Sequence, residues 1–191
     1  IWCYAGDMNK TKEVFAPILE KNPIFHHIDE MPYPALQSMF DGLYPPGLQW
    51  YWRGDFFNKL GSEIRKIHLD FGSKIPTPIS SMHLYPISGT AGRVGGKDTP
   101  WAYRNAKYAG VIVGVDPDPD KKDMITRWSK EYWEALHPFS SGGAYSNFMM
   151  DEGQDRVKAA YGDNYERLLI IKNKYDPNNL FRVNQNIRPT V

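Results

Sequence analysis

The sequence is poor in cysteine, in long apolar runs and in excess charge of either sign. Cys3 is the only cysteine among 191 residues, which excludes an internal disulfide and favours a reducing compartment such as the cytoplasm over secretion. The 23 basic and 22 acidic residues leave a net charge of +1, which gives no electrostatic reason to bind nucleic acid or an anionic membrane. No apolar run reaches the roughly 18 residues that span a bilayer.

Several signatures of catalysis and ligand binding are also missing. The five histidines show no metal-ligand spacing such as HExxH, and the alternating acids at 116–120 are separated by prolines rather than arranged as a calcium loop. The glycines between residues 89 and 96 match neither a phosphate loop nor a dinucleotide fingerprint, and no GxSxG motif occurs. We therefore expect no metal site and no serine nucleophile, and we interpret residues 88–96 as a turn between two strands.

The beginning of the chain lacks an initiator methionine and a signal peptide. Residues 1–4 read IWCY, a pattern typical of the middle of a strand, so we expect the natural start of the protein to lie upstream.

Apolar periodicity predicts alternating strands and helices within one folded domain, since 41% of the residues are hydrophobic. The clearest helical stripe is spaced 3, 4, 3 and 4 residues apart and consists of Phe57, Leu60, Ile64, Ile67 and Phe71. A second helix is expected after residue 120, with an apolar stripe of Met124, Ile125, Trp128, Tyr132 and Leu136. We predict an α+β fold with an antiparallel sheet covered on one face by helices, followed by a helical C-terminal segment. The predicted strands are 1–5, 24–28, 48–55, 79–87 and 101–115, and the earlier helices are 11–21, 33–40 and 57–71.

Polar side chains inside the predicted strands are candidates for ligand contacts. Tyr51 and Arg53 share one face of their strand, as do His83 and Tyr85, because side chains alternate along a strand. A sheet face that presents tyrosine, histidine and arginine predicts either a substrate-binding surface or a covered polar core. Arg104 lies in the long strand predicted at 101–115 and is either a solvent-exposed arginine or an anchor for an acidic group.

The last fifty residues carry a specific pattern. YSNF at 145–148 is followed by DE at 151–152, AAYGDNYERL at 159–168, IKNKYDPNNLF at 171–181 and NQNI at 184–187. This pattern resembles the end of the FAD-linked oxidases of the berberine bridge enzyme type, within the vanillyl-alcohol-oxidase-like superfamily. Upstream, YWR at 51–53, RV at 93–94, DT at 98–99 and Arg104 resemble the substrate domain of that family, in the same order.

The resemblance implies that residues 1–141 are a substrate domain and that residues 142–191 pack back toward an FAD domain that this sequence does not contain. It implies a substrate such as a sugar, an alcohol or a secondary metabolite, which transfers hydride to FAD with O2 as the final acceptor. Because most of the FAD would be held by the missing domain, we expect the 191-residue chain alone to be inactive. The residues implied to contact the flavin are Tyr145, Asn147, Asn184, Gln185 and Asn186.

One residue departs from the family pattern. In the plant and sugar-oxidising branches the residue after the matched asparagine is commonly a tyrosine proposed as the proton acceptor, whereas Phe148 here has no ionisable group. We therefore name His83 and Tyr85 as candidate catalytic residues. Two alternatives are a non-catalytic small-molecule or carbohydrate binding module and a flavin-independent relative that serves as an interaction domain. The candidate substrate-binding residues are Tyr51, Arg53, His83, Tyr85 and Arg104.

Overall fold

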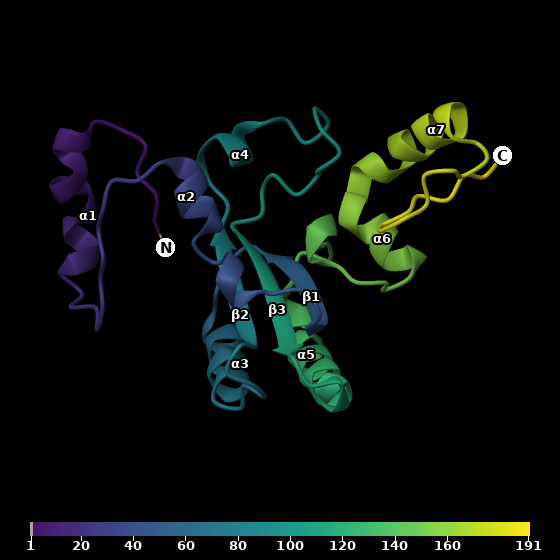
Figure 1. Cartoon of the computed structure of the whole chain (residues 1–191). Coiled ribbons are helices and arrows are strands. Elements are labelled where there is room, and N and C mark those ends of the chain that lie inside the picture. The colour runs from purple at the N-terminus through teal and green to yellow at the C-terminus, as the bar shows by residue number, and fades with distance from the viewer. Residues whose placement is uncertain (1) are drawn as a thin grey trace. The chain divides into compact units, whose positions relative to one another are not determined.

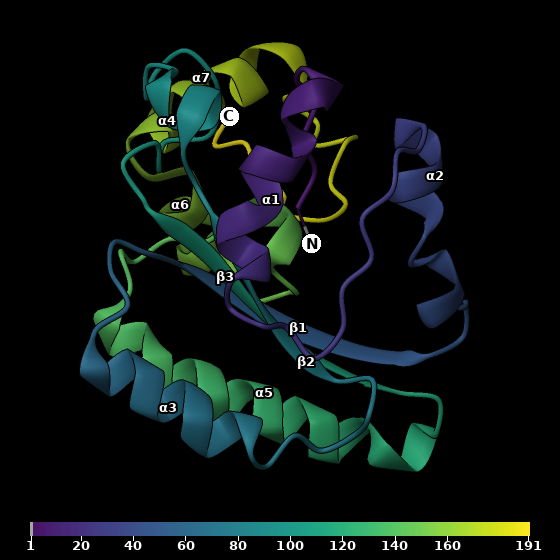
Figure 2. The same ribbon diagram turned by 90° about the vertical axis from the view of Figure 1, so that its left-hand side faces the viewer.

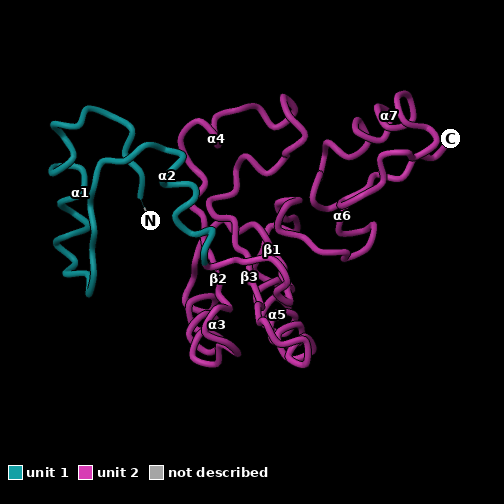
Figure 3. The backbone as a smooth tube through the Cα atoms, viewed as in Figure 1, with its two compact units in different colours: residues 1–42 teal, residues 43–191 magenta. Residues whose placement is uncertain are grey.

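A computed structural model describes residues 2–191 (Figure 1). The chain forms two compact units, Ile1–Gly42 and Leu43–Val191, each of which is described by itself (Figure 3). This division after Gly42 differs from the boundary after residue 141 that we predict between the substrate domain and the C-terminal segment. The boundary after residue 141 concerns function and stays a prediction.

The first unit contains two short helices, α1 (Thr11–Leu19) and α2 (Tyr33–Ser38), and two single 3-10 turns, Met8–Lys10 and Asp41–Leu43. Pro17 lies within α1, which is nine residues long, as expected for a helix that a proline limits. The strands predicted at 1–5 and 24–28 are wrong for the described residues, because residues 2–5 and 24–28 adopt no strand. Ile1 lies outside the described residues. Local β-propensity is not enough here, since a strand needs a neighbour to pair with.

The second unit is built on an antiparallel sheet of three strands in the order β1-β3-β2. The strands are β1 (Gln49–Phe57), β2 (Ser81–Pro86) and β3 (Tyr108–Asp116). In the pairing register, Ile112 of the central strand lies opposite Arg53 on one side and Met82 on the other. This sheet confirms the predicted antiparallel α+β fold.

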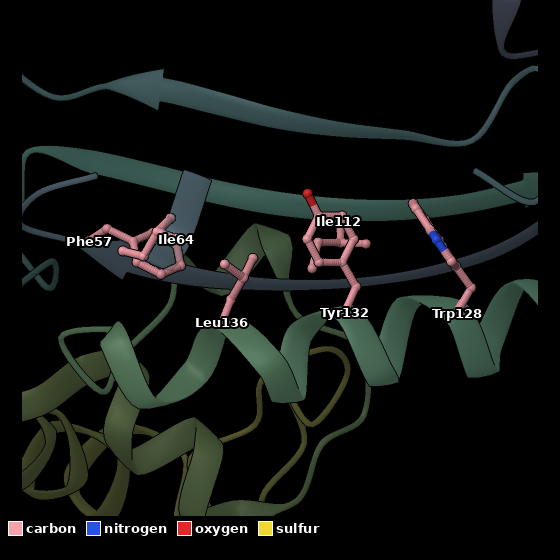
Figure 4. Packing of buried hydrophobic residues seen from close by; sticks show 6 residues of the cluster. All are labelled: Phe57, Ile64, Ile112, Trp128, Tyr132 and Leu136. Atoms are coloured by element: carbon pink, nitrogen blue, oxygen red, sulfur yellow. The ribbon is translucent and has the colours of Figure 1, made fainter. Parts of the chain in front are cut away.

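Two helices, α3 (Ser62–Gly72) and α5 (Lys122–Leu136), lie side by side over one face of this sheet (Figure 2). The apolar stripe predicted for α5 supplies Trp128, Tyr132 and Leu136 to the core between helices and sheet (Figure 4). The rest of the buried cluster comes from β1, α3 and β3, as Phe57, Ile64 and Ile112. The helices therefore cover one face of the sheet, as the sequence predicts.

Three predicted boundaries are wrong. Phe57 ends β1 and α3 begins only at Ser62, because Phe57 pairs with Tyr108 instead of continuing the helical stripe. The strand predicted at 101–115 begins at Tyr108, and residues 101–107 form an irregular loop. The turn predicted at 88–96 contains the short helix α4 (Gly89–Arg93).

The predicted helical C-terminal segment contains two helices, α6 (Gln154–Tyr161) and α7 (Tyr165–Tyr175). Further 3-10 turns occur at Pro119–Lys121, His137–Phe139, Ser146–Phe148 and Gly162–Asn164. Within residues 2–191, no helix combines the length and the apolar character that crossing a membrane requires.

Candidate functional site

The sheet face that α3 and α5 leave free carries most of the candidate site. Ile112 packs toward the helices, so its neighbours Val111 and Val113 point to the opposite face. Trp52 and Ser81 pair with Val113, and His83 pairs with Val111. Alternation along β1 and β2 therefore places an aromatic and polar surface on the free face.

A pocket of about 270 Å³ opens on this free face. The 3-10 turn Ser146–Phe148 borders it, and the Phe148 ring lies 5.4 Å from the Tyr85 ring and 5.2 Å from the Tyr145 ring, centroid to centroid. The wall thus combines aromatic rings with a few polar groups, as small-molecule sites commonly do. The lining residues are Tyr44, Trp50, Trp52, His83, Tyr85, Val111, Val113, Asn147 and Phe148.

Gly54 allows Phe148 to lie directly against β1. A Cβ at this position would be 2.8 Å from the Phe148 Cβ and 2.9 Å from the Gly110 carbonyl oxygen, closer than such atoms approach. We expect Gly54→Ala to displace the 145–148 turn and to lower the free energy of unfolding by about 1–3 kcal/mol, the usual cost of overpacking. Urea denaturation measures this. Gly42→Ala is the control, since a Cβ there meets no atom within 4 Å, and equal effects of the two substitutions would contradict the contact.

The predicted pair His83 and Tyr85 lies together in the pocket. The His83 Nδ1 atom is 3.1 Å from the Tyr85 hydroxyl, and His83 Nε2 is 2.7 Å from the Ser81 hydroxyl. Burial lowers the pKa of the His83 imidazole, while burial and then the nearby Tyr44 hydroxyl raise the pKa of Tyr85. At neutral pH the pair is therefore a neutral imidazole beside a protonated phenol.

Tyr51 and Arg53 lie on the opposite face of the sheet, so the expectation of one shared face with His83 and Tyr85 is wrong. The Arg53 guanidinium stacks on the Trp133 ring at 4.5 Å and its Nε donates to the Tyr51 hydroxyl at 3.0 Å. Alternation along each strand is as predicted, but which face α5 covers depends on tertiary packing.

Arg104 is neither in a strand nor in the pocket. Its guanidinium lies 4.3 Å from the centroid of the Trp101 ring, its Nη1 donates to the Ala91 carbonyl at 2.9 Å, and its Nη2 donates to the Thr99 hydroxyl. These contacts tie the loop before β3 to α4. The prediction of a strand arginine is therefore wrong, since the chain folds back on itself here before β3 begins.

The two ends of the C-terminal stretch, the YSNF turn at 145–148 and the NQNI loop at 184–187, are joined by hydrogen bonds. Gln185 Nε2 donates to the carbonyl oxygens of Met149 and Met150 at 3.1 and 3.2 Å, directly after the 145–148 turn. The Asn186 carbonyl accepts from Gln154 Nε2 at 3.2 Å. Asn184 has a positive φ of 58°, a conformation that asparagine adopts more readily than most residues. Gln185 therefore acts as a brace between the loops.

A buried cluster of charges, which sequence reasoning missed, joins the C-terminal segment to β1. Arg156 of α6 contacts Asp55 at 3.1 Å and Glu152 at 3.1 Å, and both carboxylate side chains are about 1% exposed. His137 Nδ1 lies 2.7 Å from the second oxygen of Asp55. Burial raises the pKa of Asp55, although the hydrogen bond with His137 and the charge of Arg156 oppose that shift. The one sequence signal for this cluster was the spacing of four residues between Glu152 and Arg156, which is typical of ion pairs along a helix.

Other parts of the described chain add no second candidate centre. Residues 2–191 hold no group of three or more potential metal ligands of the histidine, cysteine or carboxylate type. A larger hollow of about 470 Å³ lies within the first unit along the apolar side of α1, with Phe15, Leu19 and Ile28 among its lining residues. None of the site residues predicted from the sequence lines this hollow.

The residues present fit an isoalloxazine ring, the flat part of FAD. At the border of the pocket, the turn offers the Tyr145 ring and the Asn147 amide, whose Nδ2 donates to the Tyr145 hydroxyl at 3.2 Å. In the loop that Gln185 ties to Met149 and Met150, the buried Asn186 Oδ1 has no hydrogen-bond partner within the described chain. An unpaired buried acceptor of this kind is costly unless a ligand or water donates to it.

Known proteins resemble this chain in sequence and in fold. Residues 144–188 match the family described as "Berberine and berberine like". An FAD-linked oxidoreductase of Dictyostelium discoideum is 31% identical over 188 residues, which are 95% of this chain and 41% of that protein. The structure of berberine bridge enzyme from Eschscholzia californica superimposes with a TM-score of 0.81 at 20% identity, covering 96% of this chain and 44% of that one. A chitooligosaccharide oxidase gives a TM-score of 0.74 at 17% identity, covering 98% and 45%.

The chain thus spans less than half of the length of the proteins that it matches. The solved structures establish a shared fold, and the Dictyostelium protein adds similarity in sequence across nearly the whole chain. The chain is therefore similar to FAD-linked oxidoreductases over nearly its whole length, and its residues 144–188 match the berberine and berberine-like family.

Proposed function

We propose that this chain is the substrate-binding part of an FAD-dependent oxidoreductase that oxidises a small, uncharged organic molecule such as a sugar or another alcohol. The observation that supports this best is the pocket where the free face of the sheet meets the Ser146–Phe148 turn. FAD, when bound, supplies the hydride acceptor, and O2 is the proposed final acceptor. The residues of this chain bind and orient the substrate and handle its proton.

The side chains that line the pocket carry no formal charge, which supports an uncharged substrate. Trp50, Trp52 and Phe148 supply flat apolar surfaces, which suit the face of a sugar ring or of an aromatic ring. His83, Tyr85 and Asn147 supply the few polar groups that fix orientation. Among the described residues of this chain, no lysine, arginine or carboxylate lines the pocket, so these residues offer an anionic substrate no charged partner.

The C-terminal segment is proposed to hold the flavin ring against this pocket. Tyr145 and Asn147 would contact the ring directly, because their turn borders the pocket. Gln185 holds the closing loop against the carbonyl groups of Met149 and Met150, which positions Asn184 and Asn186 for the same task. These roles come from the resemblance and the geometry together.

Exposed apolar residues after α6 support a partner domain. The side chains of Ile170, Tyr175, Leu180, Phe181 and Val183 are all more than two-thirds exposed. Exposed apolar groups gathered in one segment commonly mark an interface. We propose that the FAD domain of the complete protein covers them, and that the isolated chain therefore binds FAD weakly and is inactive.

The absorbance spectrum of the full-length protein, recorded before and after denaturation, tests this function. We expect a flavin spectrum that bleaches when glucose, chitobiose or benzyl alcohol is added without oxygen, and that returns with air. A protein that carries no flavin and takes up none on titration with FAD would contradict the proposal. Calorimetric titration with the same compounds would then test the binding-module alternative, which predicts binding without any redox change.

A further inference from the structure

Three side chains on the free face of β2 form one hydrogen-bonded row. Ser81, His83 and Tyr85 are two residues apart, so they point to the same side of the sheet. The His83 ring bridges the other two, with Nε2 at 2.7 Å from the Ser81 hydroxyl and Nδ1 at 3.1 Å from the Tyr85 hydroxyl. His83 and Tyr85 line the pocket and Ser81 does not, so the row leads out of the pocket along the strand.

We propose that this row is a proton relay, in which Tyr85 accepts the proton of a substrate hydroxyl, His83 accepts the proton of Tyr85, and Ser81 holds the His83 ring in the tautomer that this requires. The inference rests on the proposed function and assigns each residue a separate task. Tyr85 is the catalytic residue that touches the substrate, and His83 and Ser81 act through it.

The proton balance of the step is complete. The substrate O–H bond breaks and its electron pair stays on the substrate oxygen, while a new O–H bond forms at Tyr85. The original Tyr85 proton moves to His83 Nδ1, and the resulting imidazolium donates through Nε2–H to the Ser81 hydroxyl oxygen. The hydride leaves from the adjacent substrate carbon, with FAD as the oxidant that receives it.

Tyr85 needs His83 because burial raises the pKa of the phenol, so the hydroxyl stays protonated at neutral pH. It accepts the substrate proton only as its own proton moves to His83. The other titratable groups that line the pocket are His83 and Tyr44, and no charged side chain lines it. Burial lowers the pKa of His83, so the imidazole is neutral at neutral pH and free to accept a proton. As the pH falls through this lowered pKa, the imidazolium accumulates and can no longer accept, so flavin reduction slows in acid.

Stopped-flow flavin reduction in the full-length protein tests the relay, with whichever of glucose, chitobiose and benzyl alcohol reduces it fastest. We expect Tyr85→Phe to slow reduction about 10²–10⁴-fold, the usual range for loss of a general base. Tyr108→Phe is the matched control, since Tyr108 packs toward the helices on the other face and should retain the wild-type rate. Wild-type rates in Tyr85→Phe would overturn the relay while leaving the proposed flavin function intact.

The positioning role of Ser81 has its own readout. Ser81→Ala removes the acceptor for Nε2–H, which destabilises the imidazolium and should move the acid limb of the pH profile to lower pH. Ser81→Thr keeps the hydroxyl and should retain the wild-type profile. An unchanged profile in Ser81→Ala would overturn this role.

Long-range ¹H–¹⁵N NMR of histidine-labelled protein tests the row without any substrate or turnover. We expect His83 to carry its proton on Nε2, and Tyr85→Phe to shift the Nδ1 resonance by removing its donor. A proton on Nδ1, or a resonance that does not respond to Tyr85→Phe, would overturn the relay whether or not the protein binds FAD.

Discussion

Replacing Arg156 with methionine is expected to lower the free energy of unfolding by about 3–5 kcal/mol, the range for removing one partner of a buried ion pair. The substitution would leave Asp55 and Glu152, both about 1% exposed, without their shared cation. It would also remove the Arg156 hydrogen bond to the Gly54 carbonyl, which has a length of 3.0 Å. Two buried carboxylates would then lose much of their electrostatic compensation.

Lys158→Met in the same helix is the matched control for this prediction. Lys158 pairs with Glu166 at 3.4 Å, but both side chains are more than 60% exposed. Exposed pairs contribute about 0–1 kcal/mol, so this substitution should change the free energy of unfolding very little. Urea denaturation followed by circular dichroism measures both variants, and equal effects would show that the buried cluster contributes no more than a surface pair.

The Arg156 cluster also connects stability with the proposed site. α6 follows the 145–148 turn by only a few residues, so its attachment to Asp55 of β1 keeps the turn beside the sheet. We therefore expect Arg156→Met to weaken FAD retention in the full-length protein as well as stability. Lys158→Met should leave that retention unchanged.

Truncating Tyr132 to alanine is expected to cost about 3–5 kcal/mol, as for other large aromatic residues removed from a core. Tyr132 is about 2% exposed and lies at the centre of the cluster between α5, α3 and the sheet (Figure 4). Its ring stacks on Phe71 with centroids 4.6 Å apart and meets Trp128 edge to face at 5.5 Å. Removing it would open a cavity between α3, α5 and the sheet.

Tyr132→Phe separates packing from hydrogen bonding at the same position. Burial raises the pKa of Tyr132 to about 12, so its hydroxyl stays protonated, and it shares a hydrogen bond of 2.6 Å with His68 Nδ1. Losing this one bond should cost about 0.5–1.5 kcal/mol. Chemical denaturation measures both variants, and equal stability of Tyr132→Ala and Tyr132→Phe would contradict the packing role. Tyr175→Ala, at a largely exposed ring, is the surface control.

Features that depend on local periodicity could be predicted from the sequence. The apolar stripe of α5 identified Trp128, Tyr132 and Leu136 as core residues, because helical spacing alone puts them on one face. The C-terminal pattern likewise placed the berberine-type segment at residues 142–191, and residues 144–188 match that family. Its two polar loops do meet, through Gln185 and the Met149 carbonyl.

Features that depend on pairing between distant segments could not be predicted in this way. Phe57 suits the helical stripe of α3 as well as the end of a strand, and only its pairing with Tyr108 decides between them. Strands predicted at 1–5 and 24–28 failed for the same reason, since propensity cannot supply a partner.

The candidate site shows most clearly which features follow from the local sequence and which depend on tertiary packing. Sequence alone determined that His83 and Tyr85 share a face and that Tyr51 and Arg53 share a face, because side chains alternate along any strand. It also determined that Phe148 cannot act as a base. Only the tertiary structure decided that α5 covers the Arg53 side, which leaves His83 and Tyr85 in an open pocket with Phe148. The physical reason is that alternation is a property of one strand, whereas the choice of face depends on where the apolar stripe of a distant helix packs.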